Sequence, residues 1–249
     1  MHAWIAGEYR TRADLINASR SYDVVLEPGD TCVVIIADTF LPESPLSFGE
    51  IDLLALRRQL FRISTSIFVT CYDKLAIIVR YDSKAVYSPA LFDRIRSRLC
   101  TFLHQDICLS ISIRDSLEKV PALHAEALNI HRISGKSHVR LPKMTYEDLG
   151  IYAILSLLPD NGLVNRFRQR LLDPVRDYDL EHDTKLMETL IEYYANDCNA
   201  KLTARKTFSH YNTVLYRLSR LKEILNLDID EPEIKLQIQI ALKLDAITE

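Results

Sequence analysis

The hydrophobic pattern of this chain changes character near residue 145. From about residue 31 to 143, apolar runs of strand length alternate with segments whose apolar residues recur every three or four positions. The predicted order is strand, helix, strand, strand, helix, strand, helix, strand. The runs at 66–70 and 75–80, joined by 71–74, have the signature of a hairpin between two strand–helix crossovers. This order predicts an α+β sandwich of the split βαβ kind.

The rest of the chain is predicted to be all helical. Thr145 and Asp148 indicate a capping box that opens a helix running to Leu158, and further helices are expected at 163–172 and 186–194. The apolar residues 234, 236, 238, 240, 242 and 244 recur at every second position, which taken alone indicates a strand. However, Pro232 suits the first turn of a helix, and 234, 238, 241 and 242 also share a helical face. We therefore expect a helix there.

Composition excludes several classes of protein. The longest apolar runs, 32–37 and 75–79, fall far short of the roughly 20 residues that span a bilayer. Residues 1–10 lack the apolar core of a signal peptide. The five cysteines form no C-x-x-C pair, and His124 and His131 lack further ligands nearby, so no metal and no cofactor are expected. No catalytic motif occurs, and we expect a cytoplasmic protein without a membrane partner.

Two short helices separated by a tight break are predicted between residues 199 and 225. Asn199 is a plausible N-cap for the first, 207–210 form the break, and the second runs from Tyr211 to Leu225. Apolar residues 214, 218, 221 and 225 of the second helix fall on one face. The opposite face carries Asn212, Thr213, Tyr216, Ser219 and Arg220, with Arg217 at its flank.

This segment is also strongly basic. Between residues 199 and 222 there are six basic and no acidic residues, so the remainder of the chain carries −9 to give the net charge of −3. The basic residues are Lys201, Arg205, Lys206, Arg217, Arg220 and Lys222. Such a patch on an acidic protein is typical of phosphate binding. The alternative is that this face has no nucleic-acid partner, because amphipathic helices with a basic solvated face are common.

A helix-turn-helix would place the start of the second helix in the major groove of DNA. There Asn212 could read adenine, an arginine could read guanine, and Thr213 could contact a phosphate or a thymine methyl group. Lys201 and Lys206 are better placed for phosphates, and His210 would either cap the helix or meet a phosphate. The predicted DNA-binding residues are Lys201, Lys206, Ser209, His210, Tyr211, Asn212, Thr213, Tyr216, Arg217 and Arg220.

Residues 186–244 resemble the C-terminal helix-turn-helix of the PucR/CdaR family of transcription regulators. The hallmark H-x-N-T-x-x-Y-R-L of that family stands here at 210–218, preceded by Thr189-Leu190, Asn199 and Ala204. One departure is Tyr211, where an arginine is usual, which puts one phosphate or base contact in doubt. The resemblance implies a sequence-specific, effector-responsive regulator that binds double-stranded DNA with the helix at about 211–225.

The middle of the chain resembles the degenerate GGDEF-like domain of the same family. The hairpin that carries Gly-Gly-Asp-Glu-Phe in an active cyclase stands here as Cys71-Tyr72-Asp73-Lys74-Leu75, without its glycines and its second acidic residue. Asp73 beside Lys74 is a poor Mg²⁺ site. We therefore expect no enzyme activity; a GGDEF-type nucleotide-binding or cyclic-dinucleotide enzyme is the alternative.

These observations predict a ferredoxin-like or GGDEF-like α+β sandwich followed by an all-α helix-turn-helix domain. The expected parts are a linker helix at 1–30, the sandwich at 31–144, a helical connector at 145–185 and the DNA-binding domain at 186–249. A homodimer or higher homo-oligomer is expected, because one small helix-turn-helix reads too few base pairs. Residues 1–22 resemble only the linker that follows a sensor domain, so either the chain is a fragment or its sensor has been lost. The middle domain could itself bind a small-molecule effector.

Overall fold

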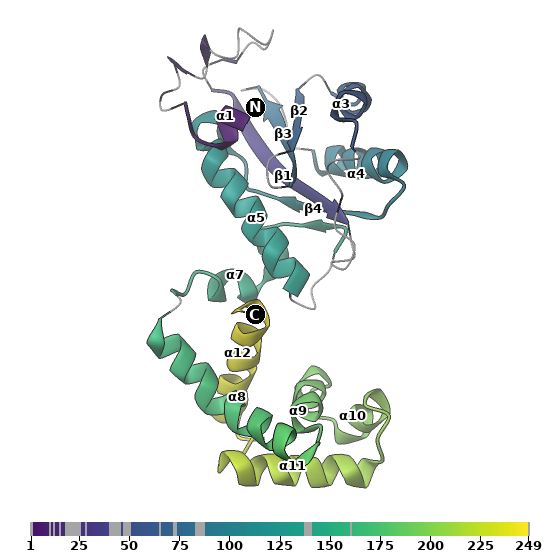
Figure 1. Ribbon diagram of the computed structural model, residues 1–249, viewed down its shortest axis with the longest axis vertical. Coiled ribbons are helices and arrows are strands. Elements are labelled where there is room, and N and C mark those ends of the chain that lie inside the picture. The colour runs from purple at the N-terminus through teal and green to yellow at the C-terminus, as the bar shows by residue number, and fades with distance from the viewer. Residues whose placement is uncertain are drawn as a thin grey trace. The chain divides into compact units, whose positions relative to one another are not determined.

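The computed structural model divides into two compact units, residues 1–153 and 154–249, which are described separately (Figure 1). The structure describes residues 2–9, 11, 13–14, 16–17, 26–27, 29–39, 46, 51–64, 66–71, 74–82, 88–136, 141–159 and 161–248. The four-part division expected from the sequence stays a prediction.

The first unit is built on a mixed sheet. Its strands are β1 (Thr31–Thr39), β2 (Ile67–Cys71), β3 (Leu75–Tyr81), β4 (Ile107–Ile111), β5 (Asp115–Ser116) and β6 (Lys143–Met144). The order across the sheet is β2-β3-β1-β4-β6, with β5 paired to β1. All pairs are antiparallel except β4 with β6. The predicted hairpin is confirmed, because Cys71 pairs with Leu75 where β2 turns into β3.

Helices cover both faces of this sheet (Figure 1). One face packs against α3 (Leu53–Phe61) and α4 (Pro89–Leu103). The other packs against α1 (His2–Ile5), the 3-10 turn η2 (Leu117–Lys119) and α5 (Val120–Lys136). Residues 32–37 of β1 are all buried, because alternate side chains enter the two cores. This double covering explains why β1 is a continuous apolar run rather than an alternating one.

The predicted helix from Thr145 to Leu158 is wrong in its extent. The capping box of Thr145 and Asp148 is present, but α6 (Tyr146–Leu149) ends at Gly150, and α7 (Ile151–Leu155) follows. Gly150 has a φ of 56°, which interrupts the helical backbone and is available to glycine without steric cost. The sequence also favours a last strand at 139–141; residues 139 and 140 lie outside the described residues, and β6 begins at Lys143.

The second unit is helical. It contains α8 (Gly162–His182), α9 (Leu186–Ala195), α10 (Ala200–Lys206), α11 (Tyr211–Leu225) and α12 (Pro232–Thr248), which surround one apolar core. The predicted helix at 163–172 is too short, because α8 continues through Pro174. The segment that alternates like a strand is helical, as expected: α12 buries Ile238, Ala241 and Leu244. A mixed α/β region followed by a helical region is thus confirmed.

Among the described residues, no helix has both the length and the apolar character required to cross a membrane.

Candidate nucleic-acid interface

The position of α10 is set by its N-terminal cap. The side-chain oxygen of Asn199 accepts hydrogen bonds from the backbone N–H groups of Lys201 and Leu202, each at 3.1 Å. The cap satisfies two donors that the first helical turn leaves without partners. The predicted N-cap is confirmed. Thr203 and Ala204 then lie buried, whereas the three basic side chains of α10 are exposed.

The turn after α10 places an aromatic side chain in solvent. The N–H of Ser209 donates to the carbonyl of Ala204 at 2.9 Å, and that of Phe208 donates to Arg205 at 3.4 Å. These two bonds close a Schellman turn, in which the left-handed position usually holds glycine. Here that position is Phe208, with a φ of 50° and a side chain that is 98% exposed. Neither the backbone conformation nor the exposure of this ring stabilises the fold.

Helix α11 begins directly after this turn. His210 occupies the N-cap position, but its side chain makes no capping hydrogen bond. The sequence allowed two roles for His210, capping α11 or contacting a phosphate. In this structure its imidazole does not cap the helix. The next three side chains, Tyr211, Asn212 and Thr213, form the first turn of α11 and are all exposed.

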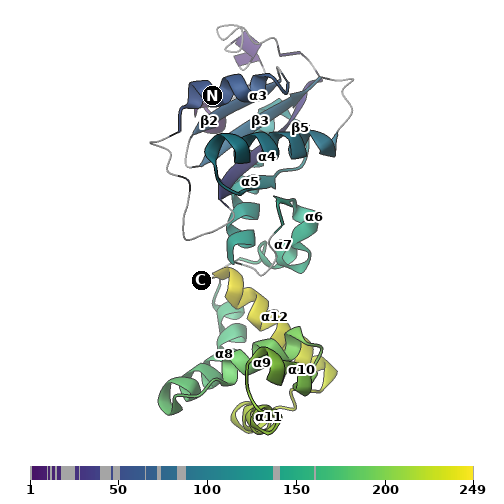
Figure 2. The same cartoon turned by 90° about the vertical axis from the view of Figure 1, so that its right-hand side faces the viewer.

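One face of α11 is buried and the opposite face is open. Val214, Leu218 and Leu221 enter the core of the unit, as the spacing predicted. The exposed stripe opposite them carries Asn212, Tyr216, Ser219 and Glu223. Helix α11 lies along one edge of the unit, seen lengthwise in Figure 1 and end-on in Figure 2. The stripe can therefore meet an extended partner without rearrangement of the core.

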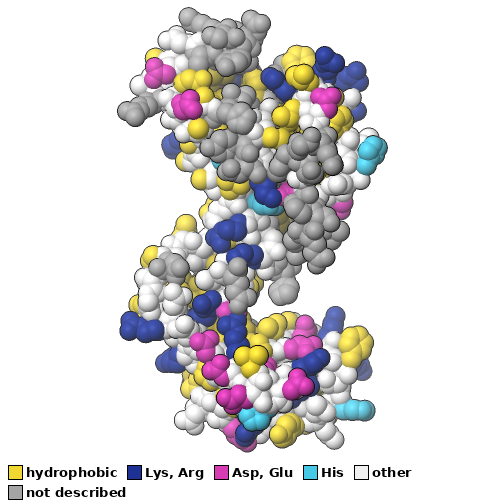
Figure 3. Space-filling view, viewed as in Figure 1, with side chains coloured by type: hydrophobic (Ala, Val, Ile, Leu, Met, Phe, Trp, Pro, Cys, Tyr) yellow, Lys and Arg dark blue, Asp and Glu magenta, His cyan; other side chains and the backbone are white. Residues whose placement is uncertain are grey.

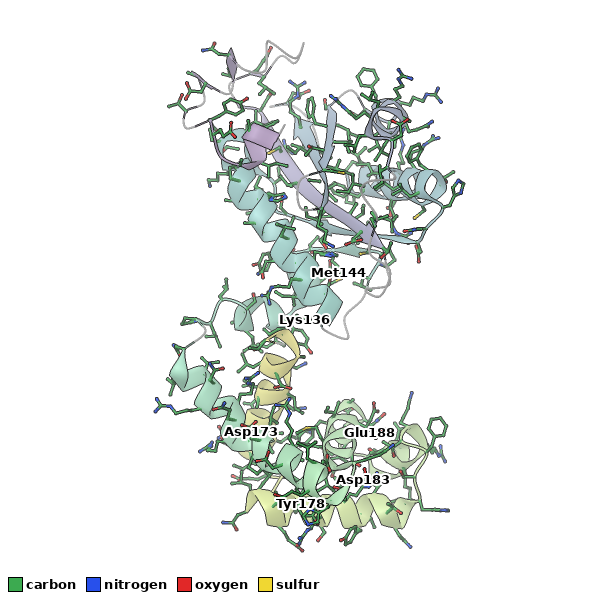
Figure 4. The ribbon with its side chains drawn as sticks, viewed as in Figure 1. Lys136, Met144, Asp173, Tyr178, Asp183 and Glu188 are labelled. Carbon is green, nitrogen blue, oxygen red and sulfur yellow. The ribbon has the colours of Figure 1, made fainter. Side chains whose placement is uncertain are left out.

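Two arginines of α11 are engaged within the protein. Nη1 of Arg217 donates to Oγ1 of Thr189 at 3.1 Å, and Thr189 is fully buried on α9. Nε of Arg220 donates to the hydroxyl of Tyr178 at 3.1 Å, and its guanidinium lies 4.9 Å from the centre of that ring. Figure 4 labels Tyr178 on α8, where it faces α11. These contacts orient α11 against α9 and α8.

Acidic side chains beyond the basic segment compensate two of its six charges. Glu223 lies 2.6 Å from Nη1 of Arg220 and is the main cause of the raised pKa of that guanidinium. Nζ of Lys222 lies 2.8 Å from Asp228 and 2.6 Å from Asp230, which raise its pKa. Of the six positive charges in the segment, those of Arg220 and Lys222 are therefore paired within the protein. Residues 199–222 look uniformly basic only because the acidic residues that pair with Arg220 and Lys222 come after residue 222.

The uncompensated positive charge is concentrated on α10. Lys201, Arg205 and Lys206, called here the α10 cations, are exposed, and their side chains form no ion pair or hydrogen bond with the described residues. Together with the stripe on α11 they form a surface of free cations beside exposed polar groups. Phosphate oxygens and base edges are partners of this chemistry.

Most of the predicted DNA-binding residues are exposed side chains of α10, of the turn after it and of α11. Lys201, Lys206, His210, Tyr211, Asn212, Thr213 and Tyr216 are exposed there, and Ser209, Arg217 and Arg220 are half-buried. The sequence-based list omitted Arg205 and Phe208. Arg205 was visible as a charge, whereas nothing in the local pattern distinguishes an exposed phenylalanine from a core residue.

The α/β unit contains a second cluster of charged groups. Oδ2 of buried Asp38, at the end of β1, lies 2.5 Å from Nζ of Lys74 and 3.4 Å from Nε2 of His131. Burial opposes ionisation of this carboxyl, but hydrogen bonds from His131, Lys74 and two backbone N–H groups lower its pKa well below the usual range. Asp38 is therefore an anion whose charge is already balanced by the ammonium group of Lys74.

No group of three or more metal-ligating side chains occurs within the part of the chain that the structure describes. Asp73, singled out in the sequence as the remnant of an acidic motif, lies outside the described residues.

Comparison with known proteins supports a regulator. Residues 186–244 match the family model of the PucR C-terminal helix-turn-helix domain. The chain is 27% identical over 192 residues to the proline-responsive transcriptional activator PutR of Bacillus subtilis, covering 74% of this chain and 46% of that protein. It is 24% identical to the purine catabolism regulatory protein of the same organism, covering 64% of this chain and 30% of the relative. The predicted resemblance at residues 186–244 is confirmed.

The chain spans less than half the length of these curated relatives. Among solved structures, it aligns with a regulator of polyketide synthase expression from Bifidobacterium adolescentis, covering 99% of this chain and 91% of that one. The identity is 15% and the TM-score is 0.41, too low to establish a common fold.

Proposed function

We propose that this chain, which carries a PucR C-terminal helix-turn-helix domain at residues 186–244, is a sequence-specific DNA-binding transcription regulator. The observation that carries the proposal is the exposed stripe of α11 beside the uncompensated α10 cations. In a helix-turn-helix, the second helix enters the major groove while the first crosses the phosphate backbone. The arrangement of polar groups on α11 and cations on α10 suits that division of roles.

Within this proposal, the residues divide into readers, phosphate contacts and supports. Asn212 reads a base edge, with Tyr216 beside it on the stripe, while Ser209, His210, Tyr211 and Thr213 contact the groove walls. The α10 cations neutralise phosphates. Arg217 and Arg220 act as positioning residues that hold α11 against Thr189 and Tyr178, rather than as the guanine readers expected from the sequence.

Exposed Phe208 belongs to the proposed interface. It lies in the turn that precedes the recognition helix, between the cationic end of α10 and His210. Phenylalanine can make apolar contact with a thymine methyl group in the major groove. A contact of this kind would give a binding role to a ring that makes no contribution to the core of the unit.

The proposal includes a homodimer or higher homo-oligomer in the cytoplasm, responsive to a small-molecule effector. Two helix-turn-helix units on one dimer would read half-sites about one helical turn apart, roughly 34 Å between centres. Doubling the number of base pairs read gives the discrimination that a single unit lacks.

We further propose that the α/β unit is a degenerate, non-catalytic GGDEF-like sandwich. The order β2-β3-β1-β4, with α3 and α4 on one face, supports a ferredoxin-like core. The ion pair of Lys74 with Asp38 supports the absence of catalysis, because the ammonium already balances that carboxylate. Cyclic-dinucleotide formation from GTP and Mg²⁺ would contradict this assignment.

Fluorescence anisotropy tests DNA reading directly. The DNA upstream of this protein's own gene is titrated over a salt series with the wild type and with Asn212→Ala. We expect the variant to lose about 1–3 kcal/mol of binding free energy on that DNA and almost none on random DNA.

Gln169→Ala is the matched control, since Gln169 is an exposed amide on another helix, α8. It should bind both DNAs as the wild type does. If all three proteins bound both DNAs equally, weakly and with strong salt dependence, the surface would be a basic patch that does not distinguish DNA sequences.

A further inference from the structure

A pocket between α3 and α4 in the α/β unit is lined by three arginines. Its volume is about 510 Å³, within the range of small-molecule sites, and it opens to solvent. The lining residues are Arg62, Ile63, Asp93, Arg94, Ser97, Arg98 and Thr101. Figure 3 shows Lys and Arg side chains gathered over α3. This α3/α4 pocket belongs to the α/β unit, whereas the residues assigned to DNA belong to the helical unit.

Among the residues that the structure describes, no acidic side chain balances the arginines of the α3/α4 pocket. Its one acidic lining residue, Asp93, lies 2.5 Å from Nζ of Lys143 and is therefore already paired. Arg98 donates to the neutral side chain of Gln59 at 3.4 Å. The guanidinium groups of Arg62 and Arg94 form no ion pair or hydrogen bond with the residues that the structure describes.

The helix alone does not account for these arginines. Arg94 and Arg98 are four positions apart on α4, a spacing at which like charges destabilise a helix. Arg62 lies at the C-terminal end of α3, where a cation is favourable to the helix dipole, but Arg94 and Arg98 lie within α4 and gain no such benefit. Bound oxyanions would remove the repulsion, because a guanidinium presents a planar fork that matches carboxylate and phosphate.

We propose that the α3/α4 pocket binds a small molecule that bears two or more oxyanion groups, carboxylates or phosphates. The hydroxyls of Ser97 and Thr101 add polar contacts on the same wall. The inference supplies a site and a ligand class for the effector that the proposed function leaves open. The test of this site does not depend on DNA binding, because binding of the small molecule is measured in the absence of DNA.

Isothermal titration calorimetry on the full chain tests the site. Pyrophosphate and succinate are the probes, and sodium chloride at matched ionic strength is the reference. We expect saturable binding of at least one probe, and pyrophosphate against succinate distinguishes a phosphate ligand from a carboxylate ligand. In Arg94→Gln/Arg98→Gln the dissociation constant should rise on the order of tenfold or more, through loss of charge-assisted hydrogen bonds.

Arg166→Gln/Arg170→Gln is the matched control. It also removes two exposed arginines four positions apart, but from α8 in the other unit, and should leave probe binding unchanged. Far-UV circular dichroism establishes that both variants fold. Absence of saturable binding by either probe, or equal loss in both variants, would overturn the proposal. So would loss of DNA affinity in Arg94→Gln/Arg98→Gln without any effect on probe binding, because the site would then serve nucleic acid.

Discussion

Phe208 shows at the scale of one residue how stability and function can diverge. Its left-handed backbone costs an ordinary side chain about 1–2 kcal/mol relative to the right-handed region. Its ring, 98% exposed, recovers nothing by burial. A residue that the fold does not need at this position is best explained by a contact outside the protein, which we assign to DNA.

Replacing Phe208 by glycine should therefore have opposite effects on stability and binding. Relief of the backbone strain, less the entropy cost of glycine, should raise the free energy of unfolding by about 0.5–1 kcal/mol. DNA affinity should fall, because glycine has no ring to pack against a thymine methyl group. Urea unfolding and anisotropy measure the two quantities.

Phe208→Ala separates the two causes. It removes the ring but keeps a Cβ in the left-handed region, so affinity should fall without a gain in stability. If Phe208→Gly and Phe208→Ala both bound DNA as the wild type does, Phe208 would have no part in the interface.

At the scale of helices, α10 and α11 differ in whether their basic side chains are already paired within the protein. The α10 cations have no partner among the described residues, whereas Lys222 of α11 is held by Asp228 and Asp230. Only a cation that replaces condensed counterions on DNA contributes to the salt dependence of binding.

Lys201→Gln/Lys206→Gln should therefore flatten the dependence of log Kd on log salt. The slope should fall by about 0.9 for each phosphate that the variant no longer neutralises, equally on specific and random DNA. Lys222→Gln removes the same type of charge from α11 and should leave the slope unchanged. The measurement is the anisotropy series from about 50 to 200 mM salt, the range over which such phosphate neutralisation is resolved. A slope changed more by Lys222→Gln than by the α10 variant would contradict the assignment.

At the scale of the whole molecule, the two units have separate apolar cores. The core of residues 154–249 is formed by α8 to α12 and draws no residue from the sheet. A unit with its own core can fold independently.

The fragment 154–249 should accordingly unfold in one cooperative transition in urea and still bind its DNA. Circular dichroism monitors the transition and anisotropy monitors binding. The full chain is the control. If the fragment lost its helical signal without a cooperative transition while the full chain unfolded cooperatively, the core of residues 154–249 would depend on the α/β unit.

Much of the secondary structure follows from the sequence because it depends on near neighbours. The order of strands and helices, the hairpin at Cys71 and Leu75, the Asn199 cap and the bounds of α11 are all set by spacing, turn residues and caps. Local pattern also predicted the buried stripe of α11. It failed where one glycine redirected the backbone, as at Gly150.

Tertiary structure alone decided which charges and rings are available to a partner. The sequence presented Arg217 and Arg220 as DNA-binding residues, and only the fold shows that Thr189 and Tyr178 contact them from distant helices. In the same way, the packing of α3 against α4 gathers arginines from two separate segments around one pocket. Helix periodicity is a short-range property that the sequence determines by itself. The pairing and exposure of a side chain depend on which distant segments meet it, and only the folded chain decides that.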